Sequence, residues 1–181
     1  IKYMFPKAHA AAYVTNAFRI AWFKVHIPLA YYAAYYSIRA KAFDAQYMIF
    51  GKEKVKNKMK EIEMKNQKKE ATKAELDMYD DLEIVLEMYE RGFEFLPVDI
   101  YESEASKFKI QDNKLRPPLN SIPGFGTVAA QGIVNARKDG KFMSIDDLKI
   151  RAKIGASGAE LLKQFGCLEG MSQSNQLSLF G

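Results

Sequence analysis

Two glycines around a phenylalanine form a candidate binding turn in this sequence of 181 residues. Gly124 and Gly126 flank Phe125. Thr127 follows, and the residues after it predict a helix over about Val128–Lys138. Glycines at these positions allow a tight turn while Phe125 enters a core. The amide groups of the turn and of the helix N-terminus then point outward together and can bind one phosphate oxygen. A tight turn without a ligand is the alternative.

A second turn of this kind lies at Ile154–Gly158. Ser144 predicts the start of a short helix before it, and a helix over Ala159–Phe165 follows, with Ser157 as the predicted N-cap. Gly155 belongs to this turn, although the glycine–apolar–glycine order of the first turn is absent. Paired units of this kind are typical of helix-hairpin-helix modules, which grip the nucleic-acid backbone without reading bases. Four cations could add phosphate contacts or be solvated surface charges: Arg137, Lys138, Lys141 and Arg151.

At the other end of the chain, Lys7 and His9 stand at the opening of a predicted helix. Positive side chains beside a helix N-terminus suit a triphosphate, because the amides and the cations attract the same anion. The alternative is an ordinary pair of surface residues.

The chain ends in a short apolar motif, Gln176-Leu177-Ser178-Leu179-Phe180. Residues 171–175 before it are mostly polar, which is typical of a flexible tether. Apolar side chains on a tether can enter a pocket of another protein while the glutamine fixes the register by hydrogen bonds. The alternative is a terminus that folds back onto its own core.

Composition and charge exclude several kinds of site. Cys167 is the single cysteine, which excludes an internal disulfide, and two histidines are too few for a zinc site, so no metal site is predicted. The single cysteine fits a reducing compartment, so we expect a cytoplasmic protein. No apolar run is long enough to span a bilayer and no signal peptide is present, so we expect no membrane partner. The net charge is +5, with basic ends and an acidic middle, which suits two surfaces facing a polyanion. No catalytic residue is assigned.

The remaining patterns predict a mainly α fold with a small β-hairpin. Thr72 and Glu75 resemble a capping box, and Gly92 can end the helix that they begin. After Gly92 the spacing of apolar residues is no longer helical, and this predicts a hairpin in which Lys107–Ile110 pairs with Lys114–Arg116. The predicted helices before this hairpin are Ala8–Val25, Pro28–Ala40, Lys52–Lys69 and Thr72–Arg91.

Several segments also occur in the order and spacing of one known family. Together they resemble the C-terminal part of the replicative DNA polymerase III alpha subunit of bacteria, in its PolC form. The resemblance covers essentially the whole chain, and the terminal motif favours the PolC form. The segments are Phe5–Tyr13, Lys24–Pro28, Arg91–Phe93, Asp99–Tyr101, Pro117–Gly126, Gly166–Leu168 and Gln176–Phe180.

This resemblance implies four parts with different roles. Residues 1–92 would be the end of the polymerase fingers, with Lys7 and His9 near the phosphates of an incoming deoxynucleoside triphosphate. Residues 93–118 would be a β-hairpin connector, and residues 119–170 a tandem helix-hairpin-helix region that grips double-stranded DNA. Residues 171–181 would be a flexible tail that binds the sliding clamp.

The family's catalytic aspartates and their Mg²⁺ lie in a palm domain that no part of this chain matches. We therefore expect this piece to bind no cofactor and to be inactive alone, although the intact enzyme would be a DNA-directed DNA polymerase. The start at Ile1, without an initiator methionine, also suggests a fragment. Two alternatives stay open: a stand-alone helix-hairpin-helix accessory protein of repair or recombination, and a structural interaction protein.

Overall fold

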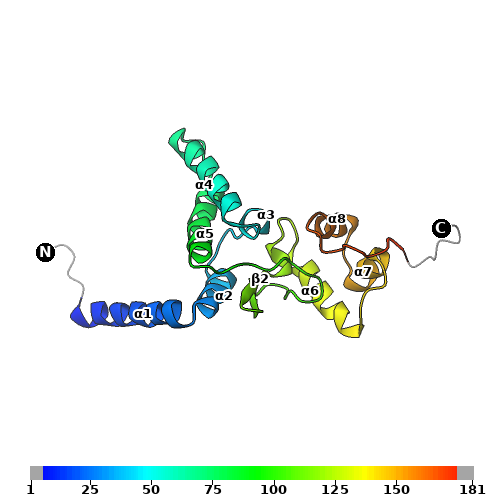
Figure 1. Ribbon diagram of the computed structural model, residues 1–181, viewed down its shortest axis with the longest axis horizontal. Helices are drawn as coiled ribbons and strands as arrows, with labels where there is room; N and C mark the ends of the chain where they lie inside the picture. Colours follow the sequence, from blue (N-terminus) through cyan, green and yellow to red (C-terminus); the bar gives the residue numbers. More distant parts are fainter. Residues whose placement is uncertain (1–5, 175–181) are drawn as a thin grey trace.

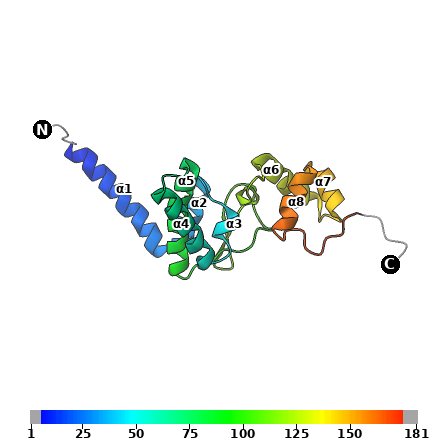
Figure 2. The same cartoon turned by 90° about the horizontal axis from the view of Figure 1, so that it is seen from above.

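The computed structural model describes residues 6–174 and confirms a mainly α-helical fold with one small β-hairpin (Figure 1). The elements in chain order are α1 (Lys7–His26), α2 (Pro28–Ile38), α3 (Ala45–Met48), α4 (Lys52–Gln67), α5 (Lys73–Glu90), β1 (Lys109–Gln111), β2 (Lys114–Arg116), the 3₁₀ turn η1 (Leu119–Ser121), α6 (Thr127–Ala136), the 3₁₀ turn η2 (Arg137–Asp139), α7 (Ile145–Ala152) and α8 (Ala156–Gln164). The molecule is elongated: α1 lies at one end, α7 and α8 lie at the other, and α2–α5 lie between them (Figure 2).

The middle of the molecule is built around a helical core formed by α2, α4 and α5. Tyr32, Leu82 and Met88 are completely buried in it. The tyrosines of α2 keep their polar ends bonded, since the Tyr32 hydroxyl donates to Glu87 at 3.1 Å and the Tyr35 hydroxyl to Asp81 at 3.3 Å. An aromatic ring can therefore fill this core without leaving a buried hydroxyl unpaired.

The long helices α4 and α5 run side by side as an antiparallel pair (Figure 1). The predicted capping box at the start of α5 is present: the Glu75 amide donates to Thr72 Oγ1 at 3.2 Å, and the Thr72 amide donates to the Glu75 carboxylate at 2.9 Å. Hydrogen bonds from Lys65 and Thr72 lower the pKa of Glu75 to about 2, so this carboxylate is ionised at neutral pH. Gly92 ends the helix with φ +82°, as predicted.

The predicted β-hairpin is also present, with a shorter first strand than expected. Lys109 pairs with Arg116, so the strand begins two residues later than Lys107. Asp112 and Asn113 form the turn with φ values of +52° and +57°, the left-handed conformation that a two-residue hairpin turn requires. Leu115 is fully buried in the helical core, which fixes the hairpin against α2.

A second core, the hairpin core, lies beneath α6, α7 and α8. Its central side chains include Ile133, Leu148 and Leu162, each completely buried. Ala45 of α3 belongs to this core, whereas Met48 of the same helix belongs to the helical core. The short helix α3, which the sequence did not predict, thus joins the two cores.

The structure corrects two details of the sequence prediction. Helix α8 begins at Ala156 instead of Ala159, and its N-cap is Gly155, so Ser157 lies inside the first turn and is not the cap. The reason is that Gly155 already has the extended backbone of an N-cap, with φ −76° and ψ 172°, two residues before Ser157.

The second correction concerns the predicted flexible tail. Its first residues are docked: the Ile145 and Asp146 amides donate to the carbonyls of Ser172 at 2.9 Å and Gln173 at 3.1 Å. These are amides of the first turn of α7, which lack partners within their own helix. Residues 171–174, which we call the strap, therefore close the N-terminus of α7.

Helices α6 and α7 approach so closely that only glycine fits at position 132. A Cβ atom added there would lie 2.3 Å from the Ala152 carbonyl oxygen. We predict that Gly132→Ala lowers the free energy of unfolding by about 1–3 kcal/mol, because the two helices must separate. Thermal unfolding followed by circular dichroism measures this. Gly126→Ala is the matched control, since a Cβ atom at Gly126 meets nothing within 4 Å. Equal melting temperatures for the two variants would contradict the predicted clash.

Candidate nucleic-acid interface

The first hairpin has the geometry that the glycine pattern predicts. Gly124 adopts φ +79°, Phe125 is buried at 3% exposure, and Gly126 is the N-cap of α6 with φ −70°. No side chain caps this helix, and its first intrahelical amide bond runs from Ala130 to the Gly126 carbonyl. The amides of Thr127 and its neighbours before Ala130 therefore stand at an open N-terminus where an anion can bind.

The second hairpin has a similar backbone conformation, with Lys153 in the place of Gly124. Lys153 adopts φ +55°, Ile154 is buried, and Gly155 is the N-cap of α8. These three residues correspond in order and conformation to Gly124, Phe125 and Gly126. Helix α8 also lacks a side-chain cap, and its first amide bond runs from Ala159 to the Gly155 carbonyl. The two open helix N-termini are thus built in the same way.

An open groove of about 660 Å³ lies between the two hairpins. We call it the interhairpin groove. It contains the N-caps of both α6 and α8, so both helix N-termini border one concave surface. Its lining residues are Gly126, Val128, Ala129, Gln131, Gly132, Asn135, Ala152, Lys153, Ile154 and Gly155.

Among these lining residues, Lys153 was not predicted from the sequence as a binding residue. It lies in the groove and is exposed. The sequence did carry a signal for it: Lys153 precedes Ile154 and Gly155 just as Gly124 precedes Phe125 and Gly126. Val128, which also lines the groove and is 89% exposed at the start of α6, was not predicted either.

The four cations named from the sequence divide into two pairs. The guanidinium of Arg137 donates to the carbonyls of Ile100 at 3.1 Å and Ser103 at 2.6 Å. Arg151 donates to the Ala136 carbonyl at 2.6 Å and to Asp147 at 3.3 Å. These arginines bind the protein's own backbone. Lys138 and Lys141, by contrast, are exposed at the end of η2 and just after it.

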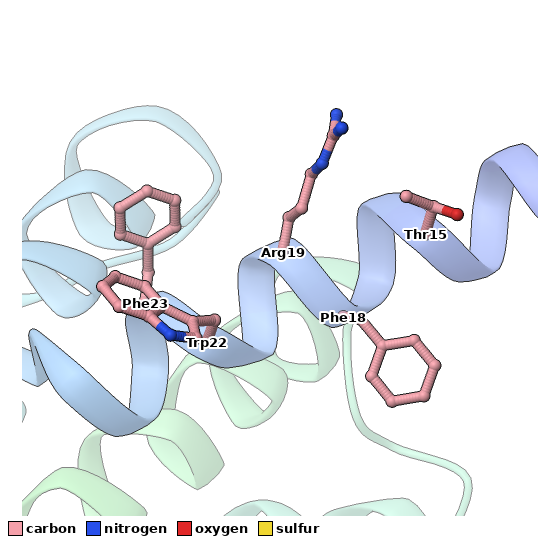
Figure 3. A pocket seen from close by; sticks show the side chains of 5 residues that line it. All are labelled: Thr15, Phe18, Arg19, Trp22 and Phe23. Atoms are coloured by element: carbon pink, nitrogen blue, oxygen red, sulfur yellow. The ribbon is translucent and has the colours of Figure 1, made fainter.

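Lys7 and His9 lie in the first turn of α1, as predicted, and both are exposed. The ring of His9 lies against Tyr13 with centroids 4.6 Å apart. None of the described residues of α1 is buried. Its apolar side chains are exposed on more than one side: Phe18 and Phe23, at 72% and 50% exposure, point to different sides of the helix (Figure 3). The apolar side chains of α1 therefore cover no core among the described residues.

A polar network fixes the C-terminal end of α1 to α5. Lys24 forms an ion pair with Glu87 at 2.6 Å, and Glu87 also accepts from the Tyr32 hydroxyl. Arg91 donates to that hydroxyl at 3.0 Å and to the Lys24 carbonyl at 2.9 Å. These bonds fix the direction in which α1 leaves the helical core, and hence where Lys7 and His9 lie.

Other kinds of site are not evident in residues 6–174. No helix there is long and apolar enough to cross a membrane. No group of three histidine, cysteine or acidic side chains in that range could hold a metal ion. Cys167 is mostly buried, and burial raises the pKa of its thiol to about 12, so it is not a reactive thiolate at neutral pH. The proposed motif Gln176–Phe180 lies outside the described residues.

Comparison with known proteins agrees with this geometry. Residues 92–177 match the family described as a helix-hairpin-helix motif. DNA polymerase III PolC-type from Caldanaerobacter subterraneus subsp. tengcongensis is 51% identical over 180 residues, and that from Clostridium perfringens is 50% identical over 181. The protein of the same name from Streptococcus pneumoniae strain R6 is 49% identical over 180 residues. These alignments cover 99%, 100% and 99% of this chain.

The chain is a homologue of PolC-type DNA polymerase III. It spans only 13%, 12% and 12% of the length of these three relatives. The resemblance inferred from the ordered motifs is confirmed along practically the whole chain. The interhairpin groove falls within the segment that matches the helix-hairpin-helix motif.

The strap leads to a prediction about stability. We predict that a chain ending at Gly170 melts at a lower temperature than a chain ending at Ser174, because only the longer chain satisfies the Ile145 and Asp146 amides. The expected difference in unfolding free energy is about 1–3 kcal/mol for two lost backbone hydrogen bonds. Calorimetry of the two truncated proteins measures it, and identical melting curves would show that the strap does not stabilise α7.

Proposed function

We propose that this chain is the part of a PolC-type replicative DNA polymerase that holds duplex DNA and tethers the enzyme to its sliding clamp. The observation that carries the proposal is the interhairpin groove, where two uncapped helix N-termini border one surface within a helix-hairpin-helix match. Amides at helix N-termini bind phosphate oxygens, which are the same for every base sequence. Binding should therefore be strong at low salt and independent of sequence.

The front end of the chain suggests a second contribution. Lys7 and His9 stand in the first turn of α1, where cations and the positive end of the helix dipole favour a triphosphate. We assign them to the phosphates of the incoming deoxynucleoside triphosphate. In the whole enzyme the reaction would transfer a nucleotidyl group to a primer 3′-hydroxyl, and we assign the Mg²⁺ ions that assist it to a part of the enzyme outside this chain. As part of a bacterial replicative enzyme, the chain would work in the cytoplasm.

Gln176–Phe180 supplies the proposed tether. A glutamine followed by apolar residues suits a pocket on the surface of the clamp. Attachment to a ring around DNA makes each return to the primer an intramolecular step, which raises the effective concentration of the enzyme at the primer. The strap is two residues from Gln176, so the tether would begin close to the hairpins.

We predict that Gly126→Val weakens duplex binding about tenfold or more, and to the same degree for unrelated sequences. The added side chain has room in the fold, since nothing lies within 4 Å of its Cβ, but it obstructs the amides at the start of α6. Fluorescence anisotropy with two duplexes of different sequence measures the affinity. Ala34→Val, on an exposed face of α2, is the control.

Replacement of Gly124 by a larger residue should also weaken duplex binding, and it should lower stability as well because Gly124 has a φ of +79°. A loss confined to one duplex would mean that bases, not phosphates, are read.

We also predict that Gln176→Ala combined with Phe180→Ala weakens binding to a bacterial sliding clamp by more than about 30-fold, the effect expected for an interface hot spot. Affinity for duplex DNA should not change, because both residues follow the strap. Surface plasmon resonance with immobilised clamp measures the first effect, and anisotropy the second. Clamp binding retained by the double variant would refute the assignment of this motif.

A further inference from the structure

The two hairpins differ in the residue that adopts the left-handed conformation. Gly124 and Lys153 both adopt left-handed backbones, with φ of +79° and +55°, and each precedes a buried apolar residue and an N-cap glycine. Glycine adopts this conformation without steric cost, whereas the Cβ of lysine makes it unfavourable. The second hairpin therefore carries a cationic side chain where the first carries none.

The surroundings of Lys153 leave its ammonium group available. Lys153 is exposed and forms no ion pair or side-chain hydrogen bond with any of residues 6–174. It is also the single charged residue among those that line the interhairpin groove. The groove lining thus contains a positive charge and no carboxylate, between two helix N-termini that attract the same kind of ion.

The two arginines named from the sequence behave differently. Arg137 and Arg151 use their guanidinium groups to bind backbone carbonyls of the hairpin core. Their charges are therefore engaged inside the protein, at positions that do not line the groove. Lys153 is the cation that the fold directs to the groove itself.

We propose that Lys153 contacts a backbone phosphate of duplex DNA in the interhairpin groove and compensates for the glycine that the second hairpin lacks. This inference rests on the proposed function, because it assigns a residue to the DNA contact proposed there. The contact would be a point-charge interaction with a phosphate oxygen, without base specificity.

The chain contains a matched control for this lysine. Lys69, at the turn between α4 and α5, also has a left-handed backbone, with φ +59°, and it is also exposed and without an ion-pair partner in the described part of the chain. Lys69→Gly and Lys153→Gly thus remove the same charge and relieve the same backbone conformation. They differ in location, since Lys69 is not among the residues of the groove.

The experiment measures duplex affinity by anisotropy from low to moderate salt for the unmodified chain and for Lys153→Gly, Lys153→Arg and Lys69→Gly. We expect Lys153→Gly to weaken binding about 5- to 10-fold near 0.1 M salt and to reduce the slope of log K against log salt by about 1. Lys153→Arg and Lys69→Gly should bind as the unmodified chain does. Neither glycine variant should melt at a lower temperature, because glycine suits the left-handed backbone.

The outcomes separate this inference from the proposed function. If the unmodified chain does not bind duplex DNA, both are wrong. If it binds and Lys153→Gly binds equally well with the same salt slope, the role of Lys153 is wrong and the groove can still bind through its amides. Equal weakening by Lys69→Gly and Lys153→Gly would also overturn the role of Lys153, because net charge alone would explain the loss.

Discussion

The arrangement of the two hairpins depends on the burial of Phe125. Its ring packs on the second helical unit, where a Cβ added to Gly158 would lie 3.4 Å from the ring carbon Cε2. The same phenylalanine holds the turn between Gly124 and Gly126 against the hairpin core. One apolar side chain therefore fixes the first turn and its distance from α8. This contact is one of those that set the separation of the helix N-termini of α6 and α8, and hence the shape of the groove between them.

The close crossing of α6 and α7 completes this unit. Gly132 allows the backbone of α6 to approach the Ala152 carbonyl, one residue before Lys153. The end of α7 is thereby fixed where the second hairpin begins. The packing of α6 on α7 and the left-handed turn at Lys153 together set the direction in which α8 starts. The strap closes the opposite end of α7, so both ends of this short helix are held by tertiary contacts.

The two cores separate the proposed tasks of the chain. The helical core holds α1 through the network of Lys24, Glu87 and Arg91, and it directs the proposed nucleotide site outward. The hairpin core holds the interhairpin groove. Helix α3 joins them because Ala45 and Met48 face different cores. The two cores are therefore connected by buried side chains of one short helix.

Elements whose signals are local could be predicted without the folded structure. The capping box at Thr72, the turn at Asp112 and Asn113 and the first hairpin at Gly124 all depend on side chains or φ angles within a few residues, so they could be predicted. The place of Lys153 in the groove, the docking of the strap and the place of α3 became visible only in the folded chain. Each depends on groups far apart in the chain: Lys153 lies across the groove from α6, Ser172 accepts from Ile145, and the four residues of α3 are held by two cores. Such contacts are set by packing, which local sequence patterns do not encode.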